Sequence, residues 1–314
     1  MLQNFVICVN SVIPQAVYLL VGILLRRFKV ISEDEVKRFT KVVFVMLYPF
    51  LMFDNLYGKE LGSHFSMALI LYALGSLAVI IAVIWLGVCK AVPDNYNRGA
   101  MIQSMFRSNI VLMGLPIATY IFGKENVATV AVLLMVVVPA YNITAVVVFE
   151  RFRGGKVSWK HIVKGVFTNP LIVGGLVAMV VILFDWTVPE VLMMPVTALS
   201  DATTPVAMVL LGASLKISGI KQDRKKVLAC IVVKLMMVPL VGIGGAILLG
   251  FRGVNLIAIT LMYATPTALA SFAMASSMGG NGELAGETVV FSTMVSCVTL
   301  PIILFVLMQG GLLC

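Results

Sequence analysis

The feature that most constrains this chain is a series of apolar runs, each about 20 residues long. A helix rises 1.5 Å per residue, so such a run covers the ~30 Å hydrocarbon core of a bilayer. Runs such as 66–89 do not alternate between apolar and polar residues, as a transmembrane strand would. Only 12% of the 314 residues are charged, against roughly 25% in a soluble domain. The sequence therefore predicts an all-α integral membrane protein.

We divide the chain into ten predicted spans by these runs. The first run begins almost at Met1 without a basic segment before it, so we expect a retained span and not a signal peptide. The five cysteines show no metal-ligand spacing, and we expect buried thiols and not a disulfide framework. The predicted spans are approximately 5–26, 39–57, 65–88, 98–122, 127–149, 161–184, 190–213, 227–250, 254–278 and 286–308.

Lysine and arginine predict the orientation of these spans. The odd-numbered loops carry 18 of them and the even-numbered loops carry three. Cytoplasmic loops are enriched in both residues, so we expect the odd loops in the cytoplasm and both termini outside. The net charge of +9 comes largely from these loop clusters. This clustering in loops between apolar runs is typical of a protein in a lipid bilayer and does not favour a nucleic acid as the partner.

A weak internal repeat divides the chain in two. Pro49 and Pro205 are 156 residues apart, and Asn109 and Pro266 are 157 apart, each pair in matching spans. Five spans per half give the halves opposite orientations, so the repeat must be inverted. We predict a first repeat over 1–150, a cytoplasmic linker over 151–160 and a second repeat over 161–314. Inverted repeats with interrupted helices are typical of secondary transporters.

The fourth and ninth spans are the predicted sites of interruption. Proline within a helix removes one hydrogen bond and clashes with the preceding turn. In lipid, the freed backbone groups need partners, so such breaks persist mainly where protein or a wet cavity covers them. The small polar residues beside each break could satisfy that backbone or bind a ligand, and two matched breaks favour a ligand. The candidate residues are Ser108, Asn109, Gly114, Pro116, Thr265, Pro266 and Thr267.

A second matched pair, Pro49 and Pro205, has Thr204 and Asp201 nearby. A carboxylate at membrane depth costs about 2.5–3.5 kcal/mol, so it should be paired, hydrated or protonated. Asp201 is either a coupling carboxylate or a structural one that accepts bonds from unwound backbone. We assign Asp201, Thr204, Pro205 and Pro49 as candidate coupling or gating residues.

Two basic residues fall inside predicted spans. Arg107 could snorkel to the cytoplasmic edge, bind an anionic substrate or pair with Asp201. For Lys234, seven or eight residues into its span, we favour snorkelling.

Several motifs resemble those of the auxin efflux carrier family, which includes the plant PIN-formed carriers and many bacterial members. The run from Asn109 to Pro116 resembles that family's fourth-span motif, an Asn followed by a Gly and a Pro. The remaining similar segments are 199–202 with 211–212, 169–171, 264–266 and Pro301.

That resemblance implies a sodium/proton-antiporter-like fold of ten helices, with helices 4 and 9 crossing at their breaks. It implies a scaffold domain (spans 1, 2, 6 and 7), a transport domain (spans 3–5 and 8–10) and a substrate carboxylate near the crossing. It also allows a homodimer through the scaffold domain. The short central loop suggests a bacterial-type member in the inner membrane. A basic residue at position 107, absent from the plant motif, disfavours an auxin-like substrate.

We therefore predict a secondary transporter of small organic anions that works by alternating access. It should need no cofactor beyond a coupling ion, proton or sodium. The alternative in the same class is a sodium-coupled carrier similar to the bile acid symporters. An intramembrane enzyme is disfavoured because the sequence lacks Gly-Asp, His-Glu-x-x-His and Gly-x-Ser-x-Gly motifs. A membrane sensor is disfavoured because no loop is long enough for an output domain.

Overall fold

The computed structural model describes residues 2–57, 66–123, 127–152, 167–168, 170–214 and 224–313. Within these ranges the regular elements are helices, joined at one place by an isolated antiparallel bridge. Residues 153–160 of the predicted linker lie outside the described residues, as does Asn169 of the sixth-span motif. All ten predicted spans coincide with helices where the structure describes them.

The helices follow the predicted order. The first half contains α1 (Leu2–Arg27), α2 (Glu33–Val42), η1 (Val43–Leu47), α3 (Tyr48–Leu56), α5 (Met67–Ala91), α6 (Asn95–Phe106), η2 (Ile110–Gly114), α7 (Leu115–Phe122) and α8 (Val127–Phe152). The second contains α10 (Pro170–Leu183), α11 (Glu190–Ala213), α12 (Arg224–Val232), η4 (Val233–Met237), α13 (Val238–Leu248), α14 (Gly253–Ala264), α15 (Ala270–Ser277) and α16 (Gly282–Gln309).

Length and hydropathy identify the membrane-crossing helices most directly. Five helical stretches in the described part of the chain are long and apolar enough to cross a bilayer. They are Met67–Ala91, Thr129–Phe152, Glu190–Ala213, Arg224–Leu248 and Gly282–Gln309. The count of ten crossings and the inverted repeat stay predictions.

Three π-helical segments precede three prolines at the same spacing. η1, η2 and η4 each end two residues before a proline, at Pro49, Pro116 and Pro239. Proline donates no hydrogen bond and its ring clashes with the carbonyl four residues earlier. A wider π turn at that point fits both constraints, and such bulges are common at functional sites.

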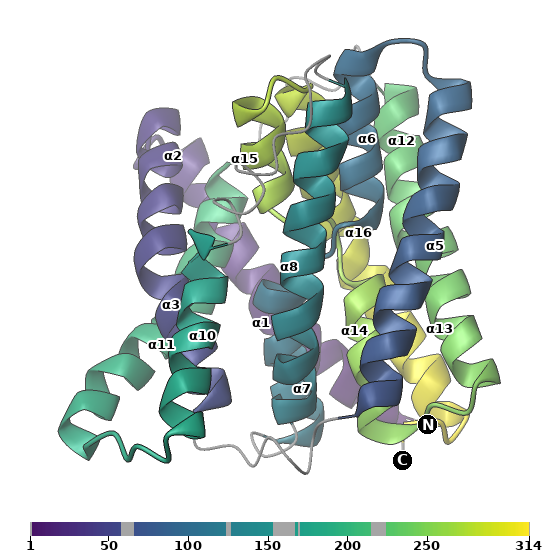
Figure 1. Cartoon of the computed structure of the whole chain (residues 1–314). Helices are drawn as coiled ribbons and strands as arrows, with labels where there is room; N and C mark the ends of the chain where they lie inside the picture. Colours follow the sequence, from purple (N-terminus) through teal and green to yellow (C-terminus); the bar gives the residue numbers. More distant parts are fainter. Residues whose placement is uncertain are drawn as a thin grey trace.

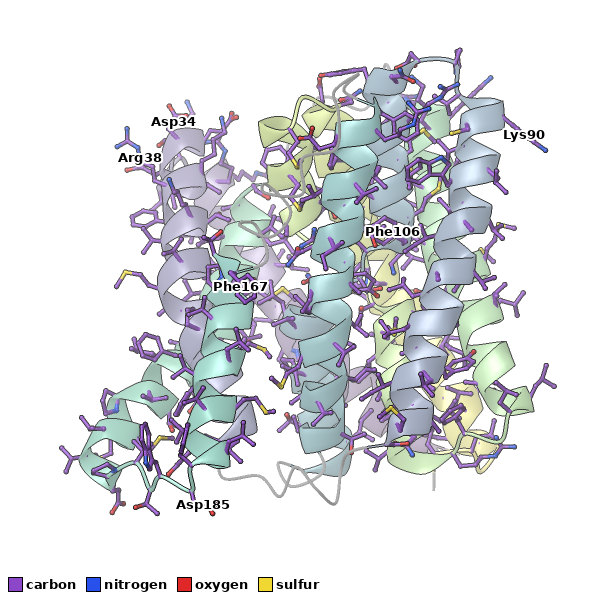
Figure 2. The ribbon with its side chains drawn as sticks, viewed as in Figure 1. Asp34, Arg38, Lys90, Phe106, Phe167 and Asp185 are labelled. Atoms are coloured by element: carbon purple, nitrogen blue, oxygen red, sulfur yellow. The ribbon has the colours of Figure 1, made fainter. Side chains whose placement is uncertain are left out.

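The helices fall into two groups. One contains α1, α2, α3, α10 and α11, and the other contains α5–α8 and α12–α16 (Figure 1). The groups mix the two sequence halves, since α10 packs on α3 and α14 packs on α8. The two termini lie at the same end of the bundle (Figure 1). Asp34 and Lys90 mark the opposite end, and Phe106, the last residue of α6, lies about midway (Figure 2).

Glycines allow the first group to pack backbone against backbone. A Cβ added at Gly22 would lie 1.9 Å from the Val209 carbonyl oxygen, and one at Gly212 would lie 2.1 Å from that of Leu19. α1 and α11 therefore touch through their main chains. Small residues at helix contacts are the usual means of close packing inside membranes.

Candidate functional site

The two helix breaks lie against each other in the interior of the bundle. We call the break in the fourth span the first break and the break in the ninth span the second break. Ser108 and Thr267 form an antiparallel β-bridge. The Asn109 amide donates to the Pro266 carbonyl at 2.7 Å, and the Ala268 amide donates to the Arg107 carbonyl at 3.3 Å. Each break thus satisfies backbone groups of the other, as the polar backbone of a buried helix break requires. The figures place this pairing near mid-height, because α6 ends there at Phe106 (Figure 2).

The threonine hydroxyls of the second break hydrogen-bond to main-chain carbonyls. The Thr265 hydroxyl donates to the Leu261 carbonyl at 2.8 Å, and the Thr267 hydroxyl donates to the Ser104 carbonyl at 2.7 Å. The Thr267 amide donates to the Ser292 hydroxyl of α16 at 3.2 Å. Of the two roles left open by the sequence, satisfying freed backbone is therefore the one observed for both hydroxyls.

Arg107 is buried inside the bundle and does not snorkel to its surface. Its guanidinium donates to the Asn142 side-chain oxygen on α8 at 2.6 Å and contacts the Met274 sulfur on α15 at 2.8 Å. Both partners are neutral. Within the described residues Arg107 has no ion pair, so the pairing with Asp201 considered from the sequence is not present.

The Lys234 side chain does not lie where the sequence predicts. The prediction that it snorkels is wrong, because its side chain, at the second position of η4, is 0% exposed. The ammonium donates to the Ser108 hydroxyl and, at 3.4 Å, to the Tyr263 carbonyl. It too lacks an ion pair among the residues described. The π turn of η4 and the adjacent break explain how a charged side chain is accommodated between helices.

Unsatisfied polar atoms gather at the same place. Seven buried side-chain atoms in the described part of the chain have no hydrogen-bond partner. Five belong to residues at the breaks or in contact with them: the Asn109 and Asn142 amide nitrogens, the Ser104 and Ser271 hydroxyls and the Gln103 amide oxygen. Four of these five groups can donate a hydrogen bond. Buried polar groups are normally satisfied, so a cluster of orphans needs an explanation such as an absent ligand.

Gly114 and Pro116 shape the first break and do not present polar groups. A Cβ at Gly114 would lie 2.7 Å from Ile110 and 3.4 Å from Leu261, so glycine permits the close approach of η2 to α14. Pro116 lies in the first turn of α7, directly after the π segment. Pro266 contributes the carbonyl that accepts from Asn109.

The second predicted cluster lies elsewhere. Asp201 is exposed on α11, and α11 continues through Pro205 without a break. Pro49 and Thr204 are half-buried. The neighbouring Thr203 is fully buried and donates to the Leu199 and Leu47 carbonyls, which ties α11 to η1. These residues therefore belong to the first helix group, and the structure does not bring them to the breaks.

Sequence reasoning missed several members of the site. Asn142, Gln103 and Ser104 lie within unbroken helices, where a single polar residue carries little signal. Lys234 had a signal, namely a cation within an apolar run followed five residues later by Pro239. Its side-chain direction depends on the π turn, which the sequence does not reveal.

A cavity lies between this region and the end of the bundle that carries Asp34 and Lys90 (Figure 2). Its volume is about 340 Å³, and it lies between α1, α2 and α11 on one side and α15 and α16 on the other. Arg26, Glu33 and Lys37 line its outer part, where Glu33 forms ion pairs with both cations. Leu269, directly before α15, lines it on the side of the second break. The cavity thus lies between the two helix groups near this end of the bundle.

The matches to known proteins include all residues of the candidate site. The family described as "Membrane transport protein" matches residues 7–304, which include both breaks. An uncharacterized transporter of the archaeon Methanothermobacter thermautotrophicus is 23% identical over 298 residues, which cover 93% of this chain and 96% of that protein. The apolar helices agree with a multi-pass membrane protein. Given a match of this extent, the chain belongs to the membrane transport protein family, that of the auxin efflux carriers that its motifs resemble.

Proposed function

We propose that this protein is a secondary transporter of small organic anions, with the substrate carboxylate bound at the paired breaks. The observation that carries the proposal is the chemistry of that place. Two buried cations without an ion pair among the described residues lie beside four unsatisfied hydrogen-bond donors. A carboxylate offers negative charge and up to four acceptor positions. It would satisfy both requirements together.

The energetic argument points in the same direction. A charged side chain at membrane depth costs about 2.5–3.5 kcal/mol on insertion scales. Arg107 and Lys234 both bear that cost with neutral partners. An anion bound beside them gains charge-assisted hydrogen bonds from Arg107, which are about twice as strong as neutral ones, and the positive potential of Lys234. The half-helix that begins at η2 adds the positive end of its dipole.

Alternating access would use the division between the helix groups. In this proposal α1, α2, α3, α10 and α11 form the scaffold, and the group with the breaks moves against it. The cavity beside α15 is then the cytoplasmic route to the site, because the basic loops predict that end to be cytoplasmic. A bacterial inner membrane location, the inverted repeat, the crossing of helices 4 and 9 and a scaffold homodimer belong to the same proposal.

Uptake into proteoliposomes tests this function. Radiolabelled mono- and dicarboxylates would be supplied one at a time, under an imposed proton gradient, a sodium gradient or neither. At least one should accumulate faster than in empty vesicles. If no carboxylate enters under any gradient, the proposal is wrong. A requirement for sodium would favour the bile-acid-symporter-like alternative.

Arg107→Gln provides the residue-level arm of this test. It removes the charge and keeps a polar side chain, so binding of the transported carboxylate should weaken at least about 30-fold. The matched control is Lys90→Gln, which removes an exposed cation at the end of α5. That control should bind as the wild type does. Wild-type affinity in Arg107→Gln would eliminate the proposed role of the guanidinium.

A further inference from the structure

Lys234 is the most deeply buried charged side chain in the described part of the chain. It lies at the second position of η4, within a continuous helical stretch from Arg224 to Leu248. Its side chain is 0% exposed, compared with 6% for Arg107. It is therefore removed from both solvent and lipid, and packing alone does not require an amine there.

Both acceptors of the Lys234 ammonium are oxygens at the breaks. Ser108 supplies a hydroxyl from the first break. Tyr263 supplies a main-chain carbonyl one residue before α14 ends at Ala264. The last four carbonyls of a helix have no intrahelical donor, and they form the negative end of the helix dipole. The ammonium thus occupies a cation-binding position at a half-helix C-terminus.

The surroundings hold that position in a fixed geometry. The Tyr263 hydroxyl bonds to Ser76 at 2.6 Å, and its ring lies against Gly242, where an added Cβ would come within 2.2 Å. The Gly242 carbonyl accepts from the Tyr72 hydroxyl at 2.5 Å. Because α5, α13 and α14 are locked together here, the Tyr263 carbonyl has little freedom to move. Oxygen acceptors held in place in this way favour a bound cation at this position.

Unwound carbonyls and half-helix C-termini are also the groups that coordinate coupling cations in transporters with broken helices. A free cation at such a place must bind from solution before the anion site is complete. Here the same charge is attached covalently to η4. The ligands that a small cation would use are consumed by the lysine.

We propose that Lys234 is a tethered cation that takes the place of a coupling metal ion. The inference rests on the proposed function, because it assumes that the protein carries an anion. It follows that the carrier should bind and move this anion without sodium. Lys234 is a positioning residue in this scheme. It holds Ser108 and the Tyr263 carbonyl together and supplies positive potential beside Arg107, with no need to touch the substrate.

The test replaces the tethered cation by a free one. Lys234→Ala leaves the oxygen ligands and opens the space that the side chain filled. Lys234→Met fills nearly the same space without charge. Purified full-length wild type and both variants would be heated in detergent with chloride salts of methylammonium, sodium or choline, and the melting temperature Tm would be recorded. Choline is the control for ionic strength, because it is too large for the lysine space.

Methylammonium or sodium, but not choline, should raise the Tm of Lys234→Ala. Neither should raise the Tm of the wild type or Lys234→Met relative to choline. A folded Lys234→Ala protein whose Tm responds equally to all three salts would overturn the proposal. So would a wild type that sodium stabilises over choline.

A measurement on the wild type needs no variant, in case Lys234→Ala does not fold. Carboxylate uptake into proteoliposomes should proceed at the same rate in sodium and in choline, and a more than twofold fall without sodium would overturn the inference. The two proposals can fail separately. If no carboxylate is transported, the Tm series still reports on the cation position. If uptake occurs and needs sodium, only the tethered cation is wrong.

Discussion

Two matched pairs of proline-bearing helices behave differently in this protein. α3 and α11, with Pro49 and Pro205, remain continuous and pack closely. The fourth and ninth spans are interrupted, and their backbones pair at Ser108 and Thr267. The difference lies in the neighbours: the interrupted pair has buried Arg107, Lys234 and a cluster of orphan donors. Proline alone bends or widens a helix, whereas a polar, charged surrounding is what stabilises an open break.

The comparison predicts that the helix group containing the first pair, with α1 packed on α11, is sensitive to volume. Gly212→Val should prevent α1 and α11 from meeting, because its Cβ would lie 2.1 Å from the Leu19 carbonyl oxygen and backbone cannot yield cheaply. We expect a loss of about 3 kcal/mol or more in the free energy of unfolding. Size-exclusion profiles and Tm in detergent measure it. Gly87→Val on α5 is the control, since an added Cβ there meets nothing within 4 Å. Equal stability of the two variants would contradict the close contact.

The interrupted pair should instead be sensitive to charge. Asn142→Asp keeps the shape of the side chain and places a carboxylate where Arg107 now has a neutral acceptor at 2.6 Å. The new ion pair should raise the Tm while it competes with the substrate, so anion affinity should fall about 100-fold. Thermal unfolding and ligand binding on one sample separate the two effects. A variant that binds the anion as tightly as the wild type would show that Arg107 is not part of the site.

Asp201 tests whether the two regions act together. It lies on the exposed side of α11, away from the breaks, and its role in coupling or gating stays a prediction. Asp201→Asn should therefore leave anion affinity within about twofold of the wild type. If the carboxylate serves coupling, the variant should transport severalfold more slowly and lose the acceleration that an imposed ion gradient gives the wild type. Uptake measured with and without the gradient decides between coupling and a structural role. An unchanged rate would assign Asp201 to structure.

The sequence was most informative about the apolar helices and the position of the breaks. Apolar runs of membrane length leave little choice of structure, and α11 has the predicted bounds of 190–213. Proline and asparagine at matching positions located both breaks. Side-chain direction was harder to predict, because three-dimensional contacts decide it. The depth of Lys234 in its apolar run predicts snorkelling, whereas a π turn directs the side chain inward to Ser108.

The smallest predicted effect concerns the cap that leads into the first break. Asp94 caps α6 by accepting from the Asn97 amide and side chain, both at 2.9 Å, and Asn97 in turn accepts from Asn281, the cap of α16. Burial alone would raise the pKa of Asp94, but the hydrogen bonds from Asn97 outweigh it and lower that pKa below its usual value. A lowered pKa in the folded state means that the cap stabilises the protein at neutral pH. That contribution is lost as the pH falls through the folded-state pKa.

Asp94→Asn keeps a capping side chain without the titratable group, so it separates the charge from the hydrogen bonds. We expect it to cost about 0.5–1 kcal/mol at neutral pH. The difference in Tm between wild type and variant should shrink as the pH is lowered toward the range where the aspartate is protonated. Asp34→Asn is the matched control, because that carboxylate is exposed in the first turn of α2. If the Tm difference between wild type and Asp94→Asn instead grew as the pH fell, folding would disfavour the ionised form of the Asp94 carboxylate. The polar link between the ends of α6 and α16 would then rest on the asparagines alone.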